Sequence, residues 1–459
     1  MERKNCFALY NEEERAQMEN TAALYRKFLS DCKTERECVK EIVRQAEEKG
    51  YRNMEDVIAE GGSLSEGDKV YRVCMKKAVA MFQIGKKPLT EGMNILGAHI
   101  DSPRLDIKQN PLFEDGELAF LDTHYYGGIK KYHYVALPLA LHGTIVKKDG
   151  TVIDINIGEA EEDPVFCVTD LLIHLAQEQM QKKGAVVVEG EDLNVLIGNE
   201  ALAGEEKEAV KANMLKLLKE QYDIDEEDFI SAEIEAVPAG KARESGFDRS
   251  MILSYGQDDR VCAYTSLKAM LEVGETEKTA CGLFVDKEEI GSVGATGMES
   301  KFFENTVAEL MILTGEYSEI NLRRALQKSR MLSSDVNAGF DPAYASAFEK
   351  KNASFLSQGL VFNKFTGARG KSGSNDANAE YLADLRRIMD DNNVHYQTCE
   401  LGKVDLGGGG TIAYILALYG MEVIDSGVPV LSMHAPWEVT SKADIYEAEK
   451  GYRAFLLYA

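Results

Sequence analysis

The sequence predicts an α/β fold, in which a mixed sheet has helices on both faces and is interrupted by an inserted, mainly β domain. Short apolar runs such as 280–285 alternate with segments of helical periodicity such as 260–272, which is the pattern of strands and covering helices in an α/β sheet. Between 106 and 240 the pattern changes to short alternating strands separated by turns. The chain has 459 residues, enough for two domains that each bury a core.

The first part of the chain is predicted to be helical and then to enter the sheet. Residues 11–84 carry apolar residues at helical spacing among charges. Thr34 with Glu37 matches a capping box, which marks the start of a helix. Residues 93–100 are predicted to form a short buried strand that ends in polar residues.

The inserted domain is predicted over 106–240. Its strands include 152–157, which follows a turn, and a polar helical stretch is expected over 204–228. Residues 1–105 and 241–459 then form one discontinuous domain around the insertion.

After the insertion the alternation of strand and helix resumes. We expect a helix over 260–272, an apolar strand over 280–285, another helix near 300–313 and a strand near Leu332. These elements complete the predicted α/β sheet.

Composition and charge exclude several classes of protein. Hydrophobic residues make up 44% and charged residues 28%, as in soluble globular proteins. Acidic residues outnumber basic ones, 77 to 52, for a formal charge of −25. A surface this negative repels phosphate backbones and anionic lipids. Neither nucleic acid nor membrane is therefore an expected partner.

The cysteines indicate a reducing compartment. All eight are scattered, and none forms a C-x-x-C pair, which is typical of reduced thiols in a cytosolic protein. The first residues carry no apolar signal-peptide core, and no apolar run is long enough to span a membrane. We therefore expect a cytoplasmic protein.

Two of the seven histidines follow apolar runs that we predict as strands. His99 lies in Gly97-Ala-His-Ile-Asp101, and His434 in Leu431-Ser-Met-His-Ala-Pro436. Asp101 is two residues from His99, so on an extended chain it points the same way and could accept the second imidazole N–H. Either histidine alone also fits a capped strand end with satisfied polar groups.

Three acidic sites follow apolar runs in the same manner. Asp258 follows Ser254-Tyr-Gly-Gln, Glu288 and Glu289 follow the run ending at Val285, and Asp335 ends Leu332-Ser-Ser-Asp. A single pair of adjacent glutamates is usually a solvated surface feature. Five sites at strand ends in one α/β chain, two imidazoles and three carboxylates, are enough to hold two cations.

The residue types fit a pair of divalent ions. Two such ions repel each other, and a shared carboxylate relieves the repulsion, so each then needs about two more nitrogen or oxygen ligands. Imidazole with carboxylate suits Zn²⁺, with Co²⁺ or Mn²⁺ as alternatives. Glu288 is left over beside a ligand and can act as a general base. The predicted ligand set is His99, Asp258, Glu289, Asp335 and His434.

These segments, in this order, resemble the aspartyl aminopeptidase family (M18) of dinuclear metallopeptidases, and most of all its bacterial branch. The resemblance covers most of the chain. It is carried by the following motifs: Gly97-Ala-His-Ile-Asp-Ser-Pro-Arg104, Asp258-Asp-Arg260, Glu288-Glu-Ile-Gly-Ser292, Ser333-Ser-Asp335 and Ser432-Met-His434.

The resemblance implies a role for each site residue. Asp258 matches the bridging aspartate, in front of a peptide bond that is cis in related enzymes. His99 and Asp335 match the ligands of one metal. Glu289 and His434 match those of the other. Glu288 matches the catalytic base, and Asp101 matches the carboxylate that orients the first histidine. The implied activity is hydrolysis of the N-terminal residue from peptides, by attack of a water held between the metals.

The resemblance also implies that the inserted domain makes dimer contacts and that dimers build a dodecamer. In the family a histidine of this domain reaches the active site of a neighbouring subunit. The segment Asp170-Leu-Leu-Ile-His-Leu175 is similar to the one that carries it, which nominates His174. The alternative is a histidine on the face of an amphipathic helix.

Substrate preference is less defined by the sequence. An acidic N-terminal residue would need a cation in its pocket, and Lys364, Arg369 and Lys371 compete for that role. Preference for N-terminal Asp or Glu is thus a hypothesis. The family often has a histidine where this chain has Asn337.

Gly409 belongs to the run Gly407-Gly-Gly-Gly-Thr411, which lacks the features of a phosphate-binding loop. It is predicted to let backbone approach the substrate.

Two other functions stay open. A related two-metal deacylase or deblocking peptidase would use the same ligands. A self-assembling binding protein without catalysis could retain the fold, but an intact ligand set with its base favours an enzyme.

Overall fold

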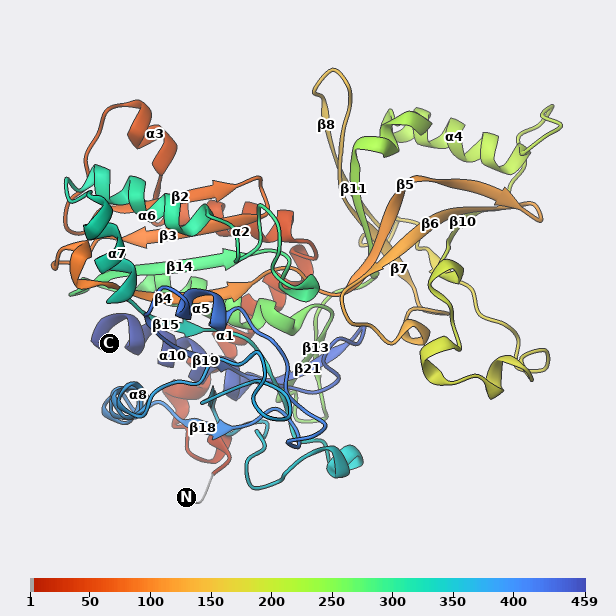
Figure 1. Ribbon diagram of the computed structural model, residues 1–459. Helices are drawn as coiled ribbons and strands as arrows, with labels where there is room; N and C mark the ends of the chain where they lie inside the picture. Colours follow the sequence, from red (N-terminus) through yellow and green to blue (C-terminus); the bar gives the residue numbers. More distant parts are fainter. Residues whose placement is uncertain (1–3) are drawn as a thin grey trace. The chain divides into compact units, whose positions relative to one another are not determined.

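The computed structural model describes residues 4–459, which form two compact units (Figure 1). The first unit comprises residues 4–101, Ala242–Met433 and Glu438–Ala459. The second comprises Ser102–Lys241 and His434–Trp437. The second unit is therefore inserted into the first, and each has its own buried core.

The first unit begins with helices, and the capping box predicted from Thr34 and Glu37 is present. α1 (Glu12–Asp31) and α2 (Glu35–Glu48) both start with a capping box, and in α2 it is formed by Thr34 and Glu37. α3 (Met54–Ala59) follows.

The prediction of helix as far as residue 84 is wrong. β2 (Lys69–Cys74) and β3 (Ala78–Gln83) form an antiparallel hairpin, with positive φ at Met75 and Lys76 in its turn. β3 is buried on both faces and pairs with β14 (Thr279–Val285), so packing in the sheet overrides the local helical spacing.

A mixed nine-stranded sheet organises the described part of this unit, in the order β1-β2-β3-β14-β4-β15-β19-β17-β18. The neighbours β14, β4, β15 and β19 run parallel, so their carboxyl ends meet at one edge of the sheet. The pairs β3–β14 and β17–β19 are antiparallel. The remaining strands are β1 (Arg52–Asn53), β4 (Met93–His99), β15 (Arg330–Ser333), β17 (Leu360–Asn363), β18 (Tyr396–Cys399) and β19 (Glu422–Gly427).

Helices cover both faces of this sheet, as predicted. Along β4, Leu96 and Ala98 belong to one core while Met93 and Ile95 belong to the other, which is the alternation of a strand buried on both sides. The first core includes residues of α1, α2, α5 (Gln257–Glu272), α8 (Ala379–Asp391) and α10 (Lys442–Tyr458). The second includes residues of α3, α6 (Phe302–Leu313), α7 (Glu319–Gln327) and α9 (Ala413–Ala417).

Two small sheets complete the first unit. β12 (Arg243–Ser245), β13 (Met251–Ser254) and β21 (Glu438–Ser441) form an antiparallel sheet. β16 (Asn337–Ala338) pairs with β20 (Pro429–Val430). Among residues 4–459 no helix has both the length and the apolar character needed to cross a membrane.

The second unit is an antiparallel seven-stranded sheet in the order β8-β7-β11-β5-β6-β10-β9, with one longer helix. The predicted strand 152–157 is β8 (Val152–Ile157), whereas the helix predicted over 204–228 is shorter, α4 (Ala209–Tyr222). α4 ends at Tyr222, and its C-cap residue Asp223 adopts a left-handed conformation. The other strands are β5 (Arg104–Asp115), β6 (Leu118–Tyr126), β7 (Leu139–Val146), β9 (Cys167–Val168), β10 (Val195–Gly198) and β11 (Ala232–Pro238).

Candidate metal centre

The parallel strands bring three of the predicted site segments to one edge of the sheet. His99 is the last residue of β4, and its neighbours β14 and β15 end at Val285 and Ser333. A 3₁₀ turn, Glu288–Ile290, follows β14, and Asp335 follows β15 by two residues. This is the sheet edge at which ligand sites form in open α/β folds.

Asp258 reaches the same place by another route. The sequence places it at the end of an apolar run, but that run is β13, which lies outside the main sheet. Asp258 lies in the first turn of α5, where its φ and ψ of −80° and 111° are not helical. The peptide bond between Asp258 and Asp259 is cis, as the resemblance implied.

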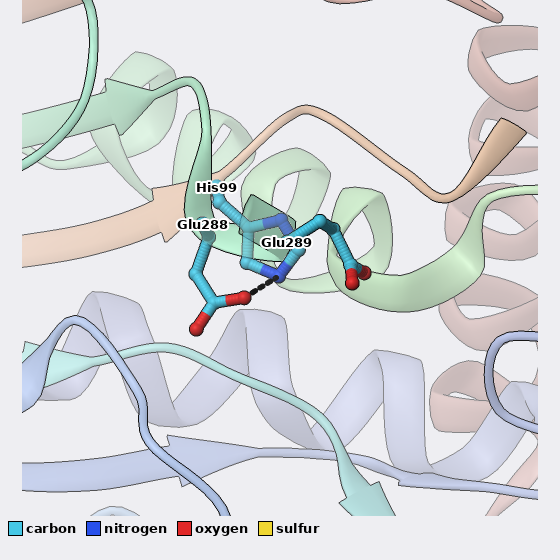
Figure 2. A group of neighbouring side chains, drawn as sticks. All are labelled: His99, Glu288 and Glu289. Carbon is cyan, nitrogen blue, oxygen red and sulfur yellow. Dashed lines mark ion pairs between the residues drawn. The ribbon is translucent and has the colours of Figure 1, made fainter. Parts of the chain in front are cut away.

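The side-chain donors gather around His99. His99 forms two groups, one with Asp258 and Asp335 and one with Glu288 and Glu289, and within each group one donor atom per residue lies within 4.8 Å of the others. Nε2 of His99 is 3.3 Å from Oδ1 of Asp258 and 3.9 Å from Oε2 of Glu288. Figure 2 shows both glutamates leaving the same turn, with the Glu288 carboxylate reaching the His99 ring.

The electrostatics of this cluster favour a cation. Burial raises the pKa of Asp335 well above its usual value, and the charges of Glu288 and Asp258 raise it further. Burial alone would lower the pKa of His99, but Asp101, Asp258 and Glu288 outweigh it and raise this pKa well above its usual value. Divalent ions would relieve the repulsion between the carboxylates and would bind the imidazole in place of a proton. The residues present therefore fit the metal that the resemblance implies.

Asp101 has a second contact that the sequence does not reveal. Its backbone carbonyl O, 3.1 Å from Nδ1 of His99, is closer to the ring than its carboxylate Oδ1, at 3.4 Å. The carboxylate also accepts the backbone N–H groups of Glu288 and Glu289, each at 3.2 Å. Asp101 thus orients the imidazole and holds the turn that carries both glutamates. The spacing of His99 and Asp101 predicts the contact of Asp101 with the imidazole, but not its contact with the turn.

His434 is grouped with the second unit, in the loop between β20 and β21. Its ring is half-buried, and its Nδ1 lies 2.9 Å from the carbonyl O of Gly128 in the same unit. An Nδ1–H that donates to this carbonyl leaves Nε2 as the acceptor nitrogen, which is the form in which histidine binds a metal.

His174 is exposed and lies in a turn of the second unit, outside any helix. The alternative of a histidine on a helix face is therefore wrong. Its neighbours form an exposed apolar segment, in which Leu172, Ile173 and Leu175 are between 58% and 70% exposed.

The candidate substrate residues lie in two neighbouring loops of the first unit. Arg369 and Lys371 line a cavity of about 180 Å³, whereas Lys364 is exposed and does not line it. Nζ of Lys371 lies 3.1 Å from Asp376 and 3.8 Å from the centre of the Phe365 ring. The charge of Lys371 is thus already compensated.

The glycine run allows the two loops to pack. At Gly408 a Cβ would lie 2.6 Å from the backbone of Ala368, and Gly409 donates its N–H to the carbonyl of Thr366 at 3.2 Å. The close approach is therefore between one loop and the other. Gly410 has open space around its Cα.

Asn337, where the family often has histidine, is fully buried and hydrogen-bonded. Its amide donates to Oδ1 of Asn363 at 3.0 Å, and its Oδ1 accepts the hydroxyl of Ser354 at 2.7 Å. It ties strands together.

Asp425 is a buried carboxylate near the site that the sequence does not single out. It lies in β19 opposite Ser333 of β15, and neither of its carboxylate oxygens has a hydrogen bond of ordinary geometry. Burial raises its pKa to about 7, the hydroxyl of Thr411 works against this shift, and the charge of Glu288 adds to it.

We expect Asp425→Asn to flatten the dependence of stability on pH. Because the folded-state pKa lies above the unfolded value near 3.8, the folded protein binds this proton more tightly, and the resulting stability is lost as the pH rises from about 4 to about 7. At about 1.4 kcal/mol for each tenfold change in proton affinity, up to about 4 kcal/mol depends on this group. Urea unfolding at pH 5 and pH 8 should show a smaller difference for Asp425→Asn than for the native chain. An equal difference would contradict the assignment, and the exposed Asp115→Asn is the control.

Comparison with known proteins identifies the family. The model of the family described as aminopeptidase I zinc metalloprotease (M18) matches residues 28–456. A probable M18 family aminopeptidase 1 of Clostridium acetobutylicum is 62% identical and covers 99% of this chain and 98% of its own length.

Solved structures agree. The crystal structure of aminopeptidase I from Clostridium acetobutylicum has a TM-score of 0.93 at 61% identity and covers 99% of both chains. That of the M18 aminopeptidase from Thermotoga maritima has a TM-score of 0.95 at 46% identity and covers both chains in full. The chain therefore belongs to the M18 family of zinc metalloproteases and is an aminopeptidase.

Proposed function

We propose that this aminopeptidase uses two divalent ions, with Glu288 as general base, to release one N-terminal residue at a time. The observation that carries the proposal is the gathering of His99, Asp258, Asp335, Glu288 and Glu289 at the carboxyl edge of the sheet. These residues come from four separate segments of the chain. Buried charged groups stabilise a fold less well than apolar packing does, so their clustering here supports a functional site.

Each ion has an assigned set of ligands. His99 and Asp335 would hold one ion, Glu289 and His434 would hold the other, and the carboxylate of Asp258 would be shared by both. Support for His434 comes from its chain position: Leu431 and Val439 form an antiparallel bridge, and Glu438 is hydrogen-bonded to the backbone N–H of Asp258. Four residues span at most about 14 Å, so the chain connection limits the separation between the Cα atoms of His434 and Glu438 to that distance. Zn²⁺ is the expected metal, with Co²⁺ or Mn²⁺ as alternatives.

Glu288 moves the proton. When bound, the metal pair lowers the pKa of water and withdraws electron density from the scissile carbonyl. Glu288 takes a proton from the attacking water and returns it to the leaving amine. Its backbone N–H is held by Asp101, which fixes the turn from which the side chain projects.

The second unit is proposed to make dimer contacts, with His174 serving the active site of a neighbouring subunit. The exposed apolar residues around His174 would be covered in such an assembly. A distant fold relative, the mApe1 dodecamer of S. cerevisiae, has a TM-score of 0.75 at 18% identity. We propose a dodecamer built from dimers for this chain.

Preference for an N-terminal Asp or Glu is proposed to depend on Arg369. It lines the cavity beside Lys371, whose charge Asp376 compensates. A guanidinium pairs with a carboxylate through two hydrogen bonds.

A panel of aminoacyl-p-nitroanilides, assayed with Zn²⁺, Co²⁺ or Mn²⁺ added in turn, tests the proposed function. Turnover of free-amine substrates with metal, and none after chelation, is the expected result. Faster turnover of N-acetylated substrates would favour a deacylase or deblocking peptidase. Absence of turnover with full metal content would favour the binding protein.

In the same assay His174→Ala should lose turnover at unchanged metal content. Mixed oligomers with Glu288→Gln should recover part of that turnover, because their sites combine residues of two subunits.

A further inference from the structure

Glu438 is a buried carboxylate beside the metal centre that is neither a proposed ligand nor the base. It begins β21, is 1% exposed, and pairs with Ser254 of β13. Its Oε2 accepts the backbone N–H of Gln257 at 2.7 Å and that of Asp258 at 3.1 Å. One oxygen therefore holds both N–H groups at the start of α5, where a helix leaves its amides without internal partners.

The side chain of Gln257 completes this arrangement. Its amide donates to the carbonyl O of Glu438 at 2.6 Å and to that of Ile252 at 3.1 Å. Its Oε1 accepts the hydroxyl of Thr440 at 2.5 Å and that of Tyr25 at 3.3 Å. The peptide that precedes Asp258 is thus fixed on both sides by β21.

We propose that Glu438 is a positioning residue that holds the Asp258 carboxylate in the geometry needed for metal binding. The proposal rests on the proposed function, in which Asp258 bridges the two ions. Glu438 also lies in the hairpin closed by the bridge between Leu431 and Val439, which carries His434. Through one side chain, the segment with the last ligand is tied to the backbone of the bridging ligand.

The strands do not need this side chain to pair. β21 is already held to β13 by backbone pairing from Met251 to Ser254, whereas the Glu438 carboxylate accepts the backbone N–H groups of Gln257 and Asp258. Loss of residues that orient metal ligands typically costs 10- to 100-fold in metal affinity or activity. We expect a loss of that size when Glu438 no longer reaches the two amides.

Three substitutions separate geometry from charge. Glu438→Gln keeps an oxygen at the same distance from the backbone and can accept the same two N–H groups, but it removes the charge. Glu438→Asp keeps the charge but shortens the side chain by one methylene, so its oxygen withdraws from the amides. Glu438→Ala removes both. The expected order of Zn²⁺ affinity is native, Gln, Asp, Ala, with Gln within about 3-fold of native and Ala about 10- to 100-fold weaker.

The matched control is Glu447→Ala. Glu447 is also fully buried and accepts hydrogen bonds from the backbone N–H of His395 at 2.7 Å, the hydroxyl of Tyr10 at 2.8 Å and the ammonium of Lys450 at 3.1 Å. It lies on α10 and is not part of the proposed site. It should lower the Tm of the metal-free protein without changing Zn²⁺ affinity.

The experiment measures Zn²⁺ affinity by competition with a chelating dye, metal content after dialysis, and the Tm of the metal-free protein for all variants. The expected order of affinities at similar Tm supports the positioning role. Native Zn²⁺ affinity in Glu438→Ala would overturn the positioning role. Tighter Zn²⁺ binding by Glu438→Asp than by Glu438→Gln would also overturn it, because the effect would then depend on the charge of the side chain. If Ala does not fold, the comparison of Gln with Asp decides. A native chain that binds no metal would overturn the proposed function as well, whereas native binding with unaffected variants overturns only the role of Glu438.

Discussion

Glu288→Gln should fold and bind metal, and its turnover should fall at least about 100-fold, the lower range for loss of a general base. Glutamine has nearly the shape of glutamate but cannot accept a proton at neutral pH. Because the backbone N–H of residue 288 is held by Asp101, the turn should stay in place after the substitution. Steady-state kinetics on a free-amine p-nitroanilide and metal analysis of the same preparation measure both effects.

Glu299→Gln is the matched control for this prediction. Glu299 is an exposed glutamate in the segment after β14, and its carboxylate accepts the hydroxyl of Tyr414 at 2.7 Å, outside the proposed ligand set. It should keep native turnover. Activity of Glu288→Gln within a few-fold of native would remove Glu288 from the mechanism and leave another group to accept the proton.

The catalytic sheet is predictable from the sequence because the rule behind it is local. Runs such as 280–285 are apolar and are followed by polar residues, and a parallel sheet places such ends together. The rule fails for β2 and β3, where charged residues and helical spacing hid an antiparallel hairpin that only pairing with β14 stabilises. It also fails for the small sheet of β12, β13 and β21, because pairing between distant short segments leaves little trace in either of them.

The residues of the site also differ in how well the sequence predicts them. His99 and Asp335 could be placed by strand ends alone, and Asp258 only by its order among the motifs, since it enters on a helix. Residues that hold the ligands are harder to find, because their partners are backbone groups rather than side chains. Glu438 lies four residues after His434, and nothing in that spacing indicates that its oxygen accepts the N–H of Asp258. Asp425 has one signal in the sequence that could have been used: it directly follows the apolar pair Val423-Ile424 in β19.

The largest loss of metal should follow Asp258→Ala, because a bridging ligand serves both ions. A protein that binds two ions through a shared carboxylate cannot relieve their mutual repulsion once that group is removed. We therefore expect the metal content after dialysis to fall from two ions per subunit towards none, and turnover to fall below that of Glu288→Gln.

Asp335→Ala provides the contrast on which this prediction depends. Asp335 shares a group with His99 and Asp258, but its proposed role concerns one ion only. It should therefore retain about one ion per subunit, by elemental analysis, under conditions in which Asp258→Ala retains none. Equal loss in the two variants would contradict the bridging role of Asp258. It would mean that both ions are lost together whichever ligand is removed, and such mutual dependence needs no shared carboxylate. Asp248→Ala, at an exposed turn that contacts Ser250, controls for the loss of an aspartate as such.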